Sequence, residues 1–228
     1  MSERVYTSSV DRLAFMPEVF TGGELSVLFG WRSGIASSYL ANWRHAGLIR
    51  SLGGRSDVHM NLVRNRQVNP EVALRRAYPY AVKVGVDILR EAGWTTQIPA
   101  KPEVAVGSAL SLYAVEAFDL TTRTDEWFKK LAPGIDLVAH GINRLKPAWA
   151  LAEMIARAQD KRLRKAWLLD PEDIDLASAR HDKESAKAMR AFGLDLACLD
   201  DSGYEHLYCE HRKSERPGLK IRAGAPRH

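Results

Sequence analysis

Four side chains near the carboxyl end have the chemistry of zinc ligands: Cys198, His206, Cys209 and His211. Standard zinc sites draw their ligands from closely spaced pairs such as C-x-x-C. No such cysteine pair is present. A strand over 204–211 would also place His206 on one face and Cys209 and His211 on the other. We therefore expect no metal ligand in this chain.

The middle of the chain contains the residue types of a metal-dependent nuclease, which needs clustered carboxylates and a lysine. Glu116, Asp119, Lys129 and Asp136 supply these types, without a tight arrangement around one hairpin. A GxxxxGK phosphate loop and a GxSxG nucleophile turn are both absent. We expect no catalytic residue and no cofactor, so the prediction is a protein that is not an enzyme.

Serine, asparagine and arginine side chains between residues 32 and 55 have the chemistry that recognises DNA. On a helix expected over 34–46, the buried stripe is Ala36, Leu40 and Trp43, and the opposite arc is small and polar. Such an arc can enter a major groove, while arginine matches phosphate bidentately. The candidate DNA-binding residues are Arg32, Ser33, Ser37, Ser38, Asn42, Arg44, His45, Arg50 and Arg55.

The elements that would position these residues are three helices and a hairpin within residues 1–68. The first helix covers about 9–16, and the second follows a Thr21-x-x-Glu24 capping box and turns Leu25 and Leu28 inward. Ser33 is the expected N-cap of the third helix, which Gly47 ends. Strands over 48–52 and 58–63 form the hairpin. This order predicts a winged helix-turn-helix, a fold that binds DNA and in other proteins binds protein partners.

A larger mixed α+β domain is expected over 69–212, followed by a flexible basic tail over 213–228. Asn69 and Pro70 open a helix and mark the domain boundary. The expected helices cover 70–77, 79–92, 125–132 (capped by Thr124), a segment from Pro147 onward, and 182–192. The expected strands cover 94–98, 103–107, 113–122, 135–139 and 204–211. The predicted fold class is therefore α+β.

Composition narrows the function classes. The net charge of +5 divides into +4 over residues 1–80, −4 over 81–211 and +5 over 212–228. Basic ends flanking an acidic body indicate a polyanionic partner such as nucleic acid. No apolar run approaches the roughly 20 residues of a membrane span, no signal peptide opens the chain, and two cysteines make no disulfide framework. We expect a cytoplasmic protein without a membrane partner.

Four blocks of sequence follow one another in a recognisable order: "YLANWRHAGLIRSLGGR", "RRAYPYAVKVGVDILREAGWTTQIP", "VEAFDLTTRTDEWF" and "LKPAWALAEMI". Over about residues 10–160 the chain resembles the AbiEi family of antitoxins and predicted transcriptional regulators of type IV toxin–antitoxin systems, which act in phage defence. The "AGWTTQIP" and "PAWALAEM" blocks are the most specific parts of this resemblance.

The resemblance implies two roles. The winged helix would bind inverted repeats of double-stranded DNA in its own promoter and repress a two-gene operon, acting as a monomer that can pair on DNA. The carboxyl-terminal domain would counteract a nucleotidyltransferase-like toxin without a stable complex. Two alternatives stay open: a stand-alone regulator whose carboxyl-terminal domain senses a ligand or partner and, less favoured, a DNA-targeted metal-dependent nuclease.

Overall fold

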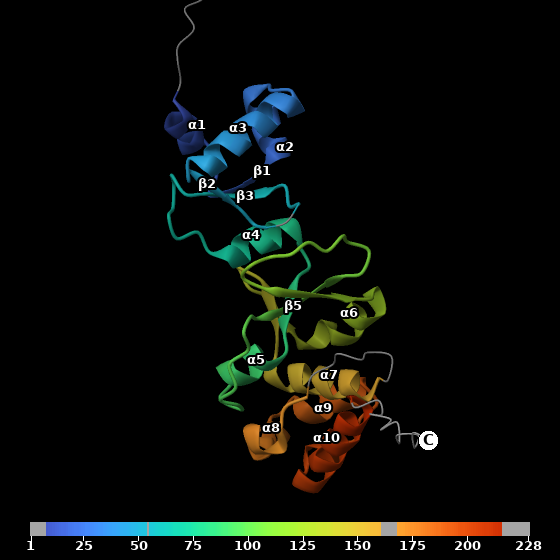
Figure 1. The fold of residues 1–228 in the computed structure, drawn as a ribbon. Helices are drawn as coiled ribbons and strands as arrows, with labels where there is room; N and C mark the ends of the chain where they lie inside the picture. The colour runs from blue at the N-terminus through green and yellow to red at the C-terminus, as the bar shows by residue number, and fades with distance from the viewer. Residues whose placement is uncertain (1–7, 54, 161–167, 216–228) are drawn as a thin grey trace, which may run out of the picture. The chain divides into compact units, whose positions relative to one another are not determined.

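The computed structural model describes residues 8–53, 55–160 and 168–215, and its helices and mixed sheets confirm the α+β class (Figure 1). The chain divides into two compact units. The first unit combines Met1–Val84 with Ala100–Leu145, and the second combines Gly85–Pro99 with Lys146–His228. The expected boundary between residues 68 and 69 lies inside the first unit. None of the described helices is long and apolar enough to cross a membrane.

The amino-terminal part of the first unit has three helices and a three-stranded antiparallel sheet of order β1-β3-β2. Its elements are α1 (Ser9–Phe15), β1 (Val19–Thr21), α2 (Gly22–Phe29), α3 (Ser33–His45), β2 (Ile49–Ser51) and β3 (Val58–Asn61). The two hairpin strands are β2 and β3, as expected. Strand β1 was not predicted, because its three residues have no alternating pattern long enough to identify a strand.

Local signals define the helix ends in this part. Thr21 and Glu24 form the predicted capping box of α2, and Gly30 ends that helix with a φ of 62°. The prediction that Ser33 caps α3 is wrong. The N-cap is Arg32, because its carbonyl accepts the N–H groups of Ile35 and Ala36 and Ser33 is already helical.

The core of this part contains Ala36, Leu40 and Trp43, so the predicted buried stripe of α3 is confirmed. Leu25 is also buried, but the prediction for Leu28 is wrong, because that side chain is 56% exposed. Phe29, four residues after Leu25, packs against the core instead, so the inward face of α2 passes through Phe29.

The rest of the first unit is built on a mixed five-stranded sheet of order β6-β5-β4-β8-β7. Its elements are α4 (Pro70–Ala77), β4 (Val82–Val84), β5 (Glu103–Gly107), β6 (Asp119–Arg123), α6 (Asp125–Leu131), the 3-10 turn η1 (Ala132–Gly134), β7 (Ile135–Asp136) and β8 (Asn143–Leu145). Asn69 caps α4 and Thr124 caps α6, both as predicted. One apolar cluster joins residues of the hairpin, α4 and this sheet, so the hairpin packs on one side against the sheet region.

Three expectations for this region are wrong. The helix expected over 79–92 is a strand followed by a short helix, with Gly85 between them at a φ of 77°. Strand β4 pairs with β5 on one side and with β8 on the other, and its β-branched Val82 and Val84 suit such a central strand. No strand forms over 94–98. The strand expected from residue 113 begins only at Asp119.

The second unit is helical in its described residues. It contains α5 (Val86–Glu91), α7 (Pro147–Gln159), η2 (Pro171–Asp173), α8 (Leu176–His181), α9 (Ser185–Ala191), η3 (Leu196–Leu199) and α10 (Asp201–Glu215). The helix from Pro147 is as expected. The helix expected over 182–192 begins later, at Ser185. Residues 216–228 of the expected tail lie outside the described residues, and residues 213–215 belong to α10.

The strand expected over 204–211 is wrong, because this segment is part of α10. Tyr204 and His211 are buried and Tyr208 is half-buried, a spacing of four and seven residues that repeats with the period of a helix. The hydroxyl of Tyr204 donates to the carbonyl of Leu169 at 3.1 Å, and the hydroxyl of Tyr208 donates to Asp170 at 2.9 Å. These bonds attach α10 to the chain before η2.

Candidate nucleic-acid interface

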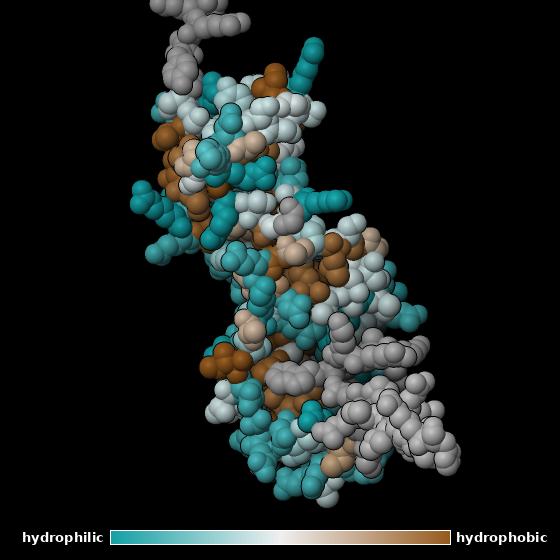
Figure 2. Space-filling model, viewed as in Figure 1, coloured by the Kyte–Doolittle hydropathy of each residue, from teal (hydrophilic) through white to brown (hydrophobic). Residues whose placement is uncertain are grey.

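All nine sequence-predicted site residues are exposed, and they occupy α3 and the β2–β3 hairpin. Arg32 to His45 account for seven of them along one helix, while Arg50 lies on β2 and Arg55 lies in the hairpin turn. Figure 2 shows the surface over α3 as mostly pale, the colour of intermediate hydropathy, interrupted by hydrophilic side chains. The exposed positions on α3 therefore agree with those expected from the helical period.

The polar side chains of α3 are available for hydrogen bonding. Ser38 donates its hydroxyl to the carbonyl of Gly34 at 3.0 Å, and its oxygen is left to accept a bond. The side chains of Ser33, Ser37 and Asn42 bond to none of the described residues. Small neighbours on this arc allow close approach of a partner. This face can therefore donate hydrogen bonds to a flat, polar partner and accept hydrogen bonds from it.

The arginines of this region are not neutralised by carboxylates of the described chain. Arg32, Arg50 and Arg55 form no ion pair there, and Arg50 donates a hydrogen bond to the sulfur of Met60 at 3.9 Å. Arg44 donates from Nε to the carbonyl of Leu40 at 3.4 Å, which fixes its stem and leaves its charge uncompensated. No Asp or Glu occurs between Leu25 and Ser56. The surface is therefore positive by composition and by the absence of internal pairing.

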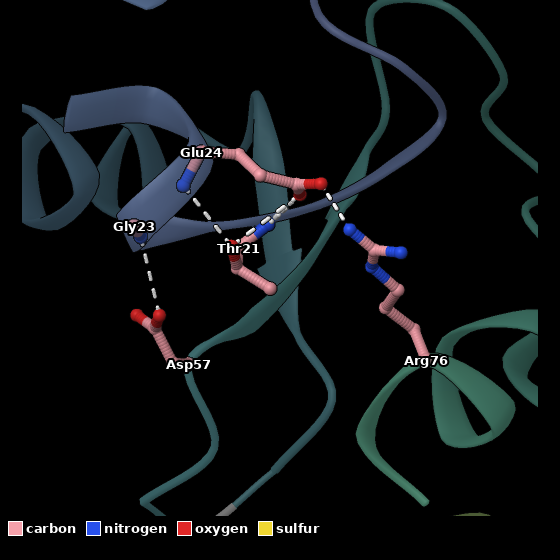
Figure 3. Close-up of polar contacts among 5 residues, drawn as sticks. All are labelled: Thr21, Gly23, Glu24, Asp57 and Arg76. Atoms are coloured by element: carbon pink, nitrogen blue, oxygen red, sulfur yellow. Dashed lines mark hydrogen bonds and ion pairs between the residues drawn. The ribbon is translucent and has the colours of Figure 1, made fainter. Parts of the chain in front are cut away.

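The starts of α2 and α3 differ electrostatically. At α2, the Thr21 hydroxyl accepts the N–H of Glu24 at 3.1 Å, and Asp57 accepts the N–H of Gly23 at 3.3 Å (Figure 3). Carboxylates of the protein thus occupy the positive end of α2. No side chain caps the start of α3, where Arg32 stands. The start of α3 is therefore left without a capping carboxylate, in contrast to the start of α2.

An aromatic stack holds the first half of α3 in place. The ring of Trp31 lies 4.8 Å from that of Phe29 and 4.2 Å from that of Tyr39, centre to centre. The guanidinium of Arg12 in α1 lies over both Trp31 and Tyr39, at 5.4 and 5.0 Å. Stacked rings with a cation above them resist sliding of α3 against α1. Sequence reasoning missed this support, since it joins three segments that are separate in the sequence.

A shallow hollow lies on the outer side of the first half of α3. Its lining residues are Arg32, Ser33, Gly34, Ile35, Ser38, Tyr39 and Asn42. Four of the nine predicted residues therefore meet there, while Ser37, Arg44 and His45 lie outside it. Ile35 was not predicted, because its apolar side chain has no hydrogen-bonding group. Its spacing of three and seven residues from Ser38 and Asn42 was the signal that could have identified it.

Arg44 also acts on the buried histidine of β3. His59 is only 4% exposed, and its Nδ1 has no hydrogen-bond partner among the described residues. Burial lowers the pKa of His59 below its ordinary value, the nearby Asp57 opposes this shift, and the charge of Arg44 adds to it. The imidazole is therefore held in its neutral form beneath the positive surface.

The other candidate groups do not assemble into sites. In the part of the chain that the structure describes, no three Cys, His, Asp or Glu side chains are placed to hold a metal ion. Asp119 lies on β6 and Asp136 on β7, which are the opposite edges of the five-stranded sheet. Four strand spacings, roughly 19 Å, separate them, so they cannot share one metal ion.

No protein-family model matches the chain, and no curated protein matches its sequence. Among solved structures, it is similar to the crystal structure of the RV2827C protein from Mycobacterium tuberculosis, with a TM-score of 0.39 and 13% sequence identity. That alignment covers 92% of this chain and 81% of the mycobacterial chain.

Proposed function

We propose that the amino-terminal part of the first unit is a winged helix-turn-helix that binds double-stranded DNA. The observation that carries this proposal is the exposed face of α3, where serine and asparagine side chains lie on the same helix as Arg32 and Arg44. The hairpin adds Arg50 and Arg55, and none of the four arginines forms an ion pair with described residues. The element order α1-β1-α2-α3-β2-β3 and its three-stranded sheet support it. Helix α3 would enter the major groove, and the hairpin would contact the backbone.

The wider role rests on the sequence resemblance to the AbiEi family. We propose that the chain is a cytoplasmic transcriptional autorepressor that binds inverted repeats in its own promoter. The chain would also be the antitoxin of a type IV system, counteracting a nucleotidyltransferase-like toxin without forming a stable complex with it. No enzymatic activity is part of this proposal. The separation of Asp119 and Asp136 is a specific observation against the nuclease alternative.

Binding of the full chain to the DNA upstream of its own gene tests the DNA-binding role. Arg44→Ala combined with Arg55→Ala should weaken binding by about 2–4 kcal/mol, roughly 30- to 1,000-fold, through loss of two charge-assisted contacts. The matched control is Arg190→Ala combined with Lys187→Ala. Arg190 also donates from Nε to the carbonyl four residues earlier, but it lies on α9 in the second unit. If the double variant in the second unit lost as much DNA binding as the double variant at Arg44 and Arg55, the assigned surface would be refuted.

Co-expression separates the two proposed roles. When the reading frame next to this gene encodes a nucleotidyltransferase, the parent chain should restore growth of cells that express it. The Arg44→Ala, Arg55→Ala variant should still restore growth while it no longer represses a promoter reporter. Failure of the parent chain to protect would refute the antitoxin role and leave the repressor role standing. A stand-alone regulator would instead repress without any effect on the neighbouring protein.

A further inference from the structure

We infer that Ile35, Ser38 and Asn42 form a reading stripe that selects A·T base pairs in the major groove. The inference deepens the proposed function and rests on it, since it assumes that α3 enters duplex DNA. It adds Ile35 to the contact surface and assigns the stripe a base preference. The three residues line the same hollow on α3, beside Arg32.

The spacing of the stripe matches the spacing of base pairs. Ile35, Ser38 and Asn42 occupy positions i, i+3 and i+7, so they lie on one face of the helix. At about 1.5 Å of rise per residue, Ile35 and Asn42 stand roughly 10 Å apart along the helix axis. With one base pair per 3.4 Å, this length covers about three base pairs. The two outer residues therefore meet different base pairs of one short site.

The chemistry of Ile35 and Asn42 points to an A·T pair, and Ser38 is compatible with one. The side chain of Ile35 is 48% exposed and forms no hydrogen bond, and the thymine methyl is the apolar feature of the major groove. The Asn42 amide is free of bonds to described residues, and a free amide matches adenine N6 and N7 in a bidentate way. The hydroxyl of Ser38 donates its proton to the carbonyl of Gly34, so its oxygen is left to accept hydrogen bonds from base amino groups.

The surroundings of the stripe favour nucleic acid over a protein partner. The surface around the hollow contains Arg32 and lacks any acidic residue from Leu25 to Ser56. The guanidinium of Arg32 beside the stripe, which forms no ion pair with described residues, complements the phosphates that border the major groove. The buried core of a protein–protein interface is enriched in apolar and aromatic side chains, and the exposed aliphatic side chain that this hollow offers is Ile35.

Base-analogue substitution tests the stripe directly. The full chain is used to select binding sites from a random 20-base-pair duplex library. In the selected site, each thymine is replaced in turn by uracil, which lacks the methyl group, and each adenine by 7-deazaadenine, which lacks N7. One uracil should weaken binding about three- to fivefold, and one 7-deazaadenine about tenfold or more.

Variants then match each analogue to its residue. Ile35→Ala should abolish the sensitivity to uracil, and Asn42→Ala should abolish the sensitivity to 7-deazaadenine. Val27→Ala is the control, since it shortens an 85% exposed apolar side chain on α2 and should keep both sensitivities. A uracil effect that persists in Ile35→Ala, or a selected site without conserved A·T pairs, would overturn the stripe.

The result also distinguishes the stripe from the proposed function. Selection of a G·C-only site that still needs Arg44 and Arg55 would overturn the stripe and leave DNA binding intact. If the chain bound no duplex at all, both the reading stripe and the proposed DNA-binding function would be overturned. Weaker binding of Ile35→Ala with no uracil effect in the parent would assign Ile35 a packing role and overturn its reading role.

Discussion

The carboxylate of Glu24 binds both the backbone N–H of Thr21, at 2.8 Å, and the guanidinium of Arg76 on α4 (Figure 3). One side chain therefore closes the capping box of α2 and ties that helix start to a residue 52 positions further along the chain. Together with the apolar cluster under the hairpin, this pair links the proposed DNA-binding part to the sheet region of the same unit.

Glu24 should matter more for stability than its partner does. Glu24→Ala removes the cap and the ion pair and should cost about 1–2 kcal/mol of unfolding free energy in urea. Arg76→Ala should cost at most about 1 kcal/mol, because the two side chains are 50% and 40% exposed and water screens the pair. Glu24→Gln keeps a residue suited to the box and should resemble Arg76→Ala. An Arg76→Ala cost above that of Glu24→Ala would contradict this assignment.

Asn61 should be among the least replaceable polar residues of the first unit. Its fully buried amide donates to the carbonyls of Leu13 at 2.7 Å and Met16 at 3.3 Å, and its oxygen accepts the N–H of Val63. Asn61→Ala leaves these buried backbone groups without a hydrogen-bond partner and should lower the free energy of unfolding by about 2–4 kcal/mol. Asn65→Ala removes a similar local turn bond, to Gln67 in a more exposed site, and should cost less than about 1 kcal/mol. Similar costs for both would contradict the argument.

Signals within a few residues made much of the fold predictable. The capping box at Thr21, the Asn69-Pro70 helix start and the stripe of α3 each depend on one segment. The failures have a different origin. For residues 204–211 the period was misread, because Tyr204, Leu207 and Tyr208 stand at the i, i+3 and i+4 spacing of a helix, and the bond of Tyr204 to Leu169 lies on that face.

The candidate site likewise contains features that one segment predicts and features that depend on contacts between segments. The exposure of α3 residues follows from the helical period, so the seven positions from Arg32 to His45 could be expected at the surface from the sequence. Arg12 lying over the rings of Trp31 and Tyr39 could not, because no sequence rule pairs α1 with those residues. Ile35 was overlooked because an exposed isoleucine is ordinary until its neighbours in the hollow are known.

Gly53 should tolerate no side chain. Its φ is 141°, and a Cβ there would lie 2.5 Å from the carbonyl oxygen of Ala114. Gly53→Ala should therefore lower the free energy of unfolding by about 1–3 kcal/mol, from backbone strain and from displacement of the hairpin. Gly34→Ala is the opposite case, since no atom lies near that position on α3, and it should raise stability by about 0.5–1 kcal/mol. Urea titration of both variants measures the contrast, and a neutral Gly53→Ala would show that the hairpin does not approach Ala114.

His59 should make the fold less stable in mild acid. Its pKa in the folded chain lies below 6.5, mainly because the ring is buried. As pH falls below about 6.5, the unfolded chain takes up a proton at this residue while the folded chain does not, so the free energy of unfolding decreases. The parent should lose stability relative to His59→Gln between pH 7.5 and 5.5, by no more than about 1.4 kcal/mol per pH unit. Parallel stability curves for the two proteins would contradict a buried neutral imidazole.

Salt dependence should separate the residues that contact phosphate from those that contact bases. Each phosphate contact contributes about 0.9 to the slope of log affinity against log salt concentration. Arg44→Ala should therefore reduce the slope by about one contact, whereas Asn42→Ala should weaken binding at every salt concentration and leave the slope unchanged. Titrations of promoter DNA from 50 to 200 mM salt, about the range where counterion release is steep, measure both. A smaller salt slope in Asn42→Ala, or an unchanged salt slope in Arg44→Ala, would contradict the roles assigned to these two side chains.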